Sequence, residues 1–200
     1  MLVFLALAFF GCQEQKYVPV TTFQEAEDPV AISTEAENLW NQTGKQLNGA
    51  WGSIDWRYSR SEVPQVSADK PCALAAWRGE KASAQLLWAA EGANGVTCHI
   101  DDFKADNASL PSTIAQARFV RYTLADINSP EFKKGGPSVL MPDMLDSLSR
   151  FDMAPRTTRP VWITIQVPQD AVAGVYTSTV TVKSQDKGKI SFPIQLKVID

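Results

Sequence analysis

The chain has 200 residues, enough for one ordinary domain of about 100 to 200 residues whose core needs neither a metal nor a disulfide. Its formal net charge of -3 and the lack of any Lys/Arg run argue against the basic surface that binds nucleic acid. One histidine and three cysteines leave too few ligands for most zinc sites, so we expect no metal and no other cofactor.

The first feature in chain order is an apolar run from Leu2 to Phe10, closed by Gly11 and Cys12 and followed by polar residues. At about 1.5 Å of rise per residue, a helix of this length covers about half of a ~30 Å hydrocarbon core and does not span a membrane. The run is typical of a secretory signal, and a cysteine after a small residue resembles a bacterial lipobox. We therefore predict a lipoprotein-type signal peptide over residues 1–12 and a lipid on Cys12 as the only membrane contact. The protein is then expected in the cell envelope, in the periplasm or at the outer-membrane surface.

Residues 13–30 are polar, acidic and proline-containing, as spacers between an anchor and a domain are, and we predict a linker there. The folded domain is expected over residues 31–200. The chain starts without the basic residues that usually open a signal, and it ends at Asp200 directly after a strongly patterned strand. Both features favour a piece of a longer protein.

The start of the domain shows one helical signal and then a change of period. Thr34, with a glutamate three residues later, has the form of a capping box and predicts a short helix over 34–42. Beyond it, Ile54, Trp56 and Tyr58 alternate with polar residues. This alternation predicts a strand whose apolar side chains, Trp56 included, lie in the core.

Further runs of period two continue to the C-terminus. Two flank the turn at Gly79, one lies around Val120, and three end the chain as an apparent antiparallel meander. Pro193 in the last run has no N–H to donate, which favours an edge or bulged position for that strand. The pattern predicts an all-β, immunoglobulin-like antiparallel β-sandwich with one short N-terminal helix and one long loop.

The long loop extends from Ile127 to Pro160 and is rich in Pro, Met and Asp, with one short helix expected near 144–150. Loops of this length in a compact domain are usually functional or packed against another body. Two acids within it, Asp143 and Asp146, are interpreted as a helix cap and a solvated neighbour, because two isolated carboxylates make a poor calcium site.

The sequence shows no catalytic constellation. His99 is the only histidine and there is no Gly-x-Ser-x-Gly elbow, so we interpret His99 as a half-exposed strand residue. Asp101 and Asp102 are neighbours in an extended run, and their side chains point to opposite faces and cannot act on one bond. No catalytic residue is assigned.

Cys72 and Cys98 are candidates for a disulfide if the chain is exported. In a simple meander of the strands around them they lie about 9 to 10 Å apart, beyond bridging distance. A corner at Gly79 that sends the strands to different sheets could bring the two together. The preferred interpretation is two buried thiols, with the disulfide kept as the alternative.

Trp51, Trp88 and Trp162 are the tryptophans that strand alternation does not force into the core. Aromatic rings stack on sugars, so these three are candidate glycan-stacking residues. The competing interpretation is that they cover the core, which is the commoner role of aromatic residues in strands.

Four segments together carry a family resemblance: Trp51-Gly-Ser-Ile-Asp-Trp-Arg-Tyr58, Ala76-Trp-Arg-Gly-Glu-Lys-Ala-Ser-Ala-Gln85, Ala117-Arg-Phe-Val-Arg-Tyr122 and Arg159-Pro-Val-Trp-Ile-Thr164. In this order and spacing, over about residues 36–200, the chain resembles the N-terminal β-sandwich domain of glycoside hydrolase family 123 and related bacterial lipoproteins. These motifs belong to the scaffold and carry no catalytic group.

The resemblance implies an exported β-N-acetylgalactosaminidase that hydrolyses glycosphingolipid-type glycans, with the substrate's 2-acetamido group as nucleophile. The family's adjacent Asp-Glu pair lies in a C-terminal (β/α)₈ barrel. This sequence contains no Asp-Glu dipeptide and stops before any barrel, so no catalytic residue is carried over. Whether the chain serves an enzyme therefore depends on the parent protein.

The leading interpretation is a non-catalytic, lipid-anchored sandwich that packs against a catalytic barrel in cis or in trans, with the segment from Ile127 to Pro160 as the contact. The alternatives are a stand-alone glycan-binding surface lipoprotein and a purely structural surface module. A contiguous exposed apolar patch favours the first, and clustered exposed tryptophans favour the second.

Overall fold

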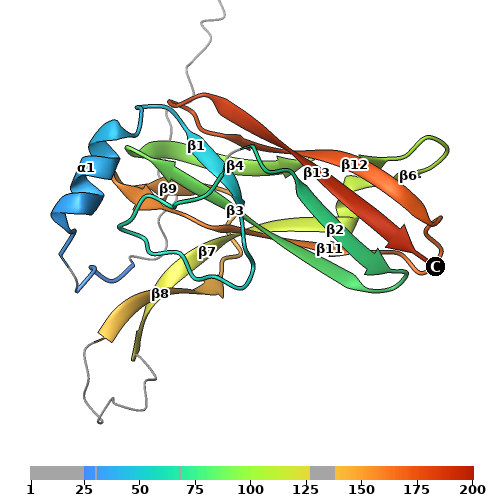
Figure 1. Cartoon of the computed structure of the whole chain (residues 1–200), viewed down its shortest axis with the longest axis horizontal. Coiled ribbons are helices and arrows are strands. Elements are labelled where there is room, and N and C mark those ends of the chain that lie inside the picture. The colour runs from blue at the N-terminus through green and yellow to red at the C-terminus, as the bar shows by residue number, and fades with distance from the viewer. Residues whose placement is uncertain (1–24, 30, 68, 127–137) are drawn as a thin grey trace, which may run out of the picture.

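The computed structural model describes residues 25–29, 31–67, 69–126 and 138–200. Two β-sheets pack face to face, and one short helix lies at the end of the molecule opposite the C-terminus (Figure 1). The predicted all-β sandwich is confirmed. The predicted signal peptide and Cys12 lie outside the described residues. No helix in the described part of the chain is long and apolar enough to cross a membrane.

The first sheet has the order β1-β3-β11-β7-β8, and the short strand β10 pairs with β3. All of its pairings are antiparallel. Its strands are β1 (Asn48–Gly52), β3 (Lys81–Ala90), β7 (Ala115–Asp126), β8 (Ser138–Leu145), β10 (Thr157–Thr158) and β11 (Val161–Gln166).

The second sheet has the order β2-β13-β12-β4-β9, with β5 and β6 attached beside β12. Strands β13 and β2 pair in parallel, whereas the other pairings are antiparallel. Its strands are β2 (Cys72–Trp77), β4 (Ala93–Ile100), β5 (Phe103–Lys104), β6 (Ser109–Leu110), β9 (Phe151–Met153), β12 (Gly174–Lys183) and β13 (Lys189–Ile199). A 3-10 turn, η1 (Ser112–Ile114), precedes β7.

The core lies between the two sheets and follows the period-two pattern of the sequence. Alternate residues of β11 are buried, as are alternate residues of β12 and β13, while their neighbours are more exposed. The fully or almost fully buried side chains include Leu86, Phe103, Ile163, Ile165, Tyr176, Val180, Ile194 and Leu196. Burial of these side chains from both sheets is the main source of stability.

Helix α1 (Thr34–Gln42) has the predicted bounds, but its cap is one residue earlier than predicted. The side chain of Ser33, not of Thr34, accepts a hydrogen bond from the backbone N–H of Ala36 at 3.1 Å. The helix is fastened through Trp40, which is fully buried and donates from Nε1 to the carbonyl oxygen of Ser61 at 2.7 Å.

Three local predictions are wrong. Residues 53–58 form a turn and a loop instead of a strand, and the segment near 144–150 contains the end of β8 instead of a helix. The predicted long loop therefore contains β8, β9 and β10 in its described part. The C-terminal strands are not a simple meander, because β11 belongs to the first sheet while β12 and β13 form a hairpin in the second.

The position of Pro193 agrees with its missing N–H. The parallel pairing between β13 and β2 begins at Ile194, one residue after the proline. Strand β13 is thus interior beyond Pro193 and has only β12 as its partner before it.

Candidate functional site

The most distinctive surface of the molecule is the loop over residues 53–65, which follows β1 and lies on the outer face of the first sheet. Gln85 of β3 donates from its side-chain amide to the carbonyl oxygens of Ser53 at 2.9 Å and Trp56 at 3.1 Å. The backbone N–H of Ser53 donates to the hydroxyl of Tyr58 at 2.9 Å. These bonds fix the backbone around Trp56, although 63% of that residue is exposed.

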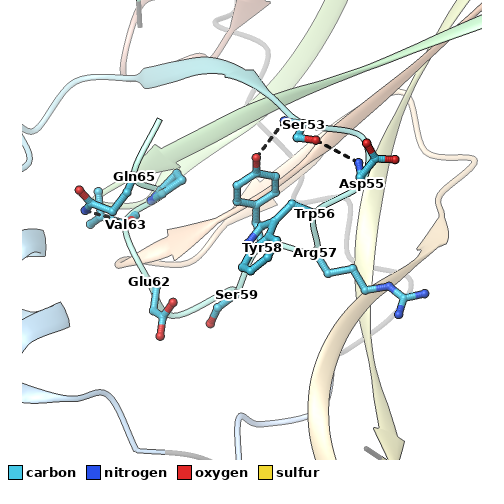
Figure 2. Close-up of a pocket in the computed structure, with 10 residues that line it drawn as sticks. Ser53, Asp55, Trp56, Arg57, Tyr58, Ser59, Glu62, Val63 and Gln65 are labelled. Carbon is cyan, nitrogen blue, oxygen red and sulfur yellow. Dashed lines mark hydrogen bonds between the residues drawn. The ribbon is translucent and has the colours of Figure 1, made fainter. Parts of the chain in front are cut away.

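A hollow of about 550 Å³ opens on one side of this loop (Figure 2). Figure 2 shows the Tyr58 ring reaching Ser53 and the Arg57 side chain pointing away from Glu62. The residues that line the hollow combine polar side chains with an indole, a phenol, a valine and a proline: Ser53, Asp55, Trp56, Arg57, Tyr58, Ser59, Glu62, Val63, Pro64 and Gln65. Hydroxyl, carboxylate and amide groups beside an exposed indole are the chemistry with which proteins bind sugars.

A groove of about 320 Å³ lies on the other side of Trp56, between the loop and β8. Val120 and Trp162, from β7 and β11, belong to the sheet beneath it, and Ile54 and Leu145 stand on either side. Ile54 is 47% exposed and Leu145 is 42% exposed. With Trp56 they form an apolar surface, which we call the Trp56 face: Ile54, Trp56, Val120, Pro142, Leu145 and Trp162. Arg57 and Asp143 form an exposed ion pair beside it, with 3.8 Å between Nη2 and Oδ1.

A buried ion pair lies near the Trp56 face. The guanidinium of Arg159 donates from Nη1 to Oε1 of Glu25 at 2.5 Å and from Nη2 to Oε2 at 2.6 Å. The backbone N–H of Tyr122 adds a hydrogen bond to Oε1 at 3.0 Å, and Arg60 approaches Oε2 at 3.5 Å. The side chain of Arg159 is 3% exposed and that of Glu25 is 11% exposed. Two parallel N–H···O bonds between a guanidinium and a carboxylate are the strong, directional form of this contact.

The environment of Glu25 explains its ionisation. Burial by itself raises the pKa of the carboxyl, but the hydrogen bonds and charge of Arg159, the Tyr122 N–H and the charge of Arg60 together outweigh burial and lower the pKa below 4.5. The phenol of Tyr122 is buried, which raises its pKa, so it stays protonated. Its hydroxyl donates to the carbonyl oxygens of Tyr58 at 3.0 Å and Thr158 at 3.1 Å as a shared bond.

A second buried ion pair joins Arg121 of β7 to Asp146, which follows β8. The same aspartate accepts a hydrogen bond from the backbone N–H of Leu148 at 2.9 Å. Both arginines contact the ring of Phe151, whose centroid is 4.2 Å from the guanidinium carbon of Arg159 and 6.0 Å from that of Arg121. The interpretation of Asp146 as a solvated residue or a helix cap is therefore wrong, because it neutralises a buried arginine.

The three tryptophans predicted to stack on glycans differ in burial. Trp51 is 8% exposed, packs edge-on against Phe192 and donates from Nε1 to the carbonyl oxygen of Pro193 at 3.0 Å. Trp88 is 1% exposed. Both rings belong to the core, so neither offers a face to a glycan, and this part of the expectation is corrected. Trp162 is half-buried in the groove and stays a candidate.

Cys72 and Cys98 are free thiols in the structure. They lie on β2 and β4, which are separated by β13 and β12 in the second sheet, so the corner at Gly79 does not bring them together. Burial raises the pKa of Cys72 to about 11 and that of Cys98 to about 12. Both are therefore protonated and weakly nucleophilic at neutral pH.

The remaining predicted residues form no shared site. His99 is exposed on β4, with its Nε2 3.2 Å from the carboxylate of Asp101. Asp102 accepts a hydrogen bond from the backbone N–H of Ser112 at 2.7 Å and so holds the turn before β7. Within the described ranges, no group of three or more His, Cys, Asp or Glu residues is arranged to hold a metal ion.

Sequence reasoning missed Trp56, Glu25 and Arg159 as notable residues. The alternation over residues 54–58 predicts a core position for Trp56, because period two does not distinguish a half-buried strand from a loop that exposes the same side chains. Glu25 lies in the range predicted as linker. One signal is present in the sequence: Arg159 and Pro160 directly precede the strongly apolar strand β11, and an arginine buried beside a sheet needs an anion.

A family model described as the glycoside hydrolase 123 N-terminal domain matches residues 51–184. A search among curated proteins found no match. Among solved structures, a family 123 glycoside hydrolase from Clostridium perfringens, described in terms of glycolipid glycan hydrolysis, is similar with a TM-score of 0.69 and 21% sequence identity. The similarity covers 78% of this chain and 27% of that chain.

Two further solved structures are more distant. The PapD-like domain 7 of human CEP192 has a TM-score of 0.35 and 11% identity, covering 91% of this chain and 99% of that chain. The sialic acid binding region of a Streptococcus sanguinis adhesin has a TM-score of 0.34 and 16% identity, covering 64% of this chain and 28% of that chain. Neither bears on function. The match over residues 51–184 covers more than half of the sequence, and the chain therefore belongs to the glycoside hydrolase 123 N-terminal domain family.

Proposed function

We propose that this chain is the non-catalytic N-terminal domain of an exported, lipid-anchored glycosidase of the β-N-acetylgalactosaminidase type, and that it packs against a catalytic barrel in cis or in trans. Family membership supports the proposal, as does the fold likeness to the clostridial enzyme, of which the chain spans 27%. The lipid anchor on Cys12 and the location in the cell envelope rest on the sequence of residues 1–12 alone.

The observation that carries the packing role is the Trp56 face. Its loop is fixed by side-chain hydrogen bonds from the sheet, yet it presents Ile54 and Trp56 to solvent, and Leu145 is exposed across the groove. Apolar side chains held rigidly at the surface lose little conformational entropy when a partner covers them, which favours a protein interface. One wall of this groove is β8, which belongs to the segment predicted to contact the barrel.

An immunoblot of native cells with antiserum against residues 31–200 tests how the partner is attached. A barrel adds about 250 residues, so a linked enzyme runs at roughly 50 kDa or more. A sole band near 22 kDa, the mass of this chain, leaves partnership in trans or a separate role.

Surface plasmon resonance then tests the contact itself. The chain from residue 13 is immobilised, and the family 123 catalytic barrel of the same organism is the analyte. We expect Trp56→Ala to weaken binding by about tenfold or more, as truncation of an aromatic anchor does. Trp77→Ala is the matched control, because Trp77 is a 53% exposed tryptophan of the second sheet. Equal effects of the two variants, or no binding by the unaltered chain, contradict the proposal.

A second candidate function is glycan binding by a stand-alone surface lipoprotein. It is favoured by the hollow in Figure 2, where Trp56 is exposed beside the polar side chains of Asp55, Glu62 and Gln65. Titration with N-acetylgalactosamine, followed by tryptophan fluorescence, separates the two candidates. A saturable signal that Trp56→Ala abolishes supports glycan binding, and an unchanged signal leaves protein docking as the role of this face.

A further inference from the structure

The segment around Glu25 binds to the sandwich in the manner of a ligand. Residues 25–28 have no regular secondary structure, yet the carboxylate of Glu25 is received by two arginines and one backbone N–H. Arg60 also donates to the carbonyl oxygen of Ala26 at 3.1 Å. These contacts fasten a segment that has no strand partner of its own, and nearly all of them converge on a single side chain.

The receiving site is held in place by contacts that do not involve Glu25. Nη1 of Arg159 also donates to the carbonyl oxygen of Val120 at 2.7 Å. The backbone N–H of Arg159 donates to the carbonyl oxygen of Trp88, also at 2.7 Å. The guanidinium lies over the rings of Phe151, at 4.2 Å, and Tyr122, at 5.1 Å. These contacts set the position and plane of the guanidinium, so the donors already point to the place where a carboxylate sits.

The positive charge of the buried arginine requires an anion in this site. Arg159 is a buried cation, and Arg60, whose side chain is 17% exposed, adds a second positive charge beside it. A buried arginine without an anion is strongly destabilising, because its charge has lost water and gained no partner. Glu25 supplies the anion to both arginines.

The site also connects two parts of the fold. Arg60 belongs to the same 53–65 loop as Trp56, whereas Arg159 lies between β10 and β11, two strands of the first sheet. The carboxylate of Glu25 bridges the two. The Tyr122 hydroxyl makes a parallel connection, from β7 to the carbonyl oxygen of Tyr58 in that loop.

We propose that Arg159, Arg60 and the backbone N–H of Tyr122 form a carboxylate-binding socket, that Glu25 is its intramolecular ligand, and that the socket accepts a free carboxylate when Glu25 is removed. The segment over residues 25–28 then ties the 53–65 loop to the first sheet. This inference does not depend on the glycosidase role, because it concerns residues of this chain alone.

Chemical rescue tests the socket. Glu25→Ala empties it, and we expect the unfolding equilibrium constant in sodium chloride to rise about a hundredfold or more, as when one partner of a buried ion pair is removed. Sodium acetate at the same ionic strength is expected to restore part of this loss in a saturable manner. Glu27→Ala, which removes an exposed acid two residues away, is the matched control and should show neither the loss nor the acetate effect.

The outcomes are distinct. Acetate-specific, saturable stabilisation of Glu25→Ala alone supports the socket. If acetate stabilises the unaltered chain and Glu27→Ala as much as it stabilises Glu25→Ala, the effect is a general salt effect and overturns the proposal. A Glu25→Ala variant that is as stable as Glu27→Ala overturns it too. If Glu25→Ala does not fold, Glu25→Gln takes its place. The proposal then requires amides of residues 57–60 to exchange about tenfold faster than in Glu27→Gln, the change expected for loss of a hydrogen bond to a charged group. Equal exchange overturns it.

Discussion

Glu25 and Arg159, 134 positions apart in the chain, form a two-pronged ion pair in which the side chain of Arg159 is 3% exposed and that of Glu25 is 11% exposed. The pair brings a segment without secondary structure against the connection between β10 and β11, beside the loop that carries Trp56. The pair therefore connects the beginning of the described chain to the neighbourhood of the Trp56 face.

Arg159→Lys tests how much of this contact depends on the shape of the guanidinium. Lysine keeps the charge but cannot donate two parallel bonds to Glu25 and a third to Val120. We expect a loss of about 2 kcal/mol or more in the free energy of unfolding, measured by urea denaturation. The control is Arg57→Lys, in the exposed pair with Asp143, where the expected change is below about 0.5 kcal/mol. Similar losses in the two variants would show that the buried geometry contributes nothing.

The stability of the fold should also depend on pH through Glu25. Its folded-state pKa is lowered below 4.5, so its contribution is fully present above pH 4.5. As the pH falls below 4.5, the unfolded state binds the proton first, and the contribution is lost progressively until the folded carboxyl is protonated too. We expect the difference in unfolding free energy between the unaltered chain and Glu25→Gln to shrink from pH 6 to pH 3. A difference that stays constant over this range contradicts the ion pair, because carboxyl groups common to both proteins cancel.

The strands were predictable where burial on one face leaves a clean alternation, as in β12 and β13. Their assignment to sheets was not, because periodicity records which residues face the core and not which strand lies alongside. Strand β11 has the same alternation as β12 but pairs with β3 and β7 in the other sheet. The parallel contact between β13 and β2 likewise has no local signature.

The candidate site was less predictable than the fold, and Trp56 and Glu25 show why. The alternation of Ile54, Trp56 and Tyr58 is typical of a strand. In the structure, the Gln85 side chain instead donates hydrogen bonds to backbone carbonyl oxygens of this segment, and Ile54 and Trp56 are exposed. Glu25 lies among polar, acidic residues that resemble a spacer. Its burial depends on a partner far away in the chain, so no local pattern could reveal it.

The two described cysteines should be slow to react. With the pKa of Cys72 at about 11 and that of Cys98 at about 12, no more than about one thiol in a thousand is ionised at pH 8. In a chain with Cys12→Ser, we expect native labelling by a thiol reagent to be at least tenfold slower than labelling in urea, and slower at Cys98 than at Cys72. Mass spectrometry under non-reducing conditions gives the opposing result if it finds a Cys72–Cys98 disulfide.

Trp51 and Trp56, five positions apart, should differ strongly in how much stability the same substitution removes. Trp51 is 8% exposed, packs on Phe192 and hydrogen-bonds to Pro193, so Trp51→Ala is expected to lower the free energy of unfolding by about 3 to 5 kcal/mol. Trp56 is 63% exposed, and Trp56→Ala should change stability by less than about 0.5 kcal/mol. Urea unfolding of both variants measures the contrast. A large loss of stability in Trp56→Ala would mean that its ring supports the fold, and its exposure could then no longer be attributed to a binding role.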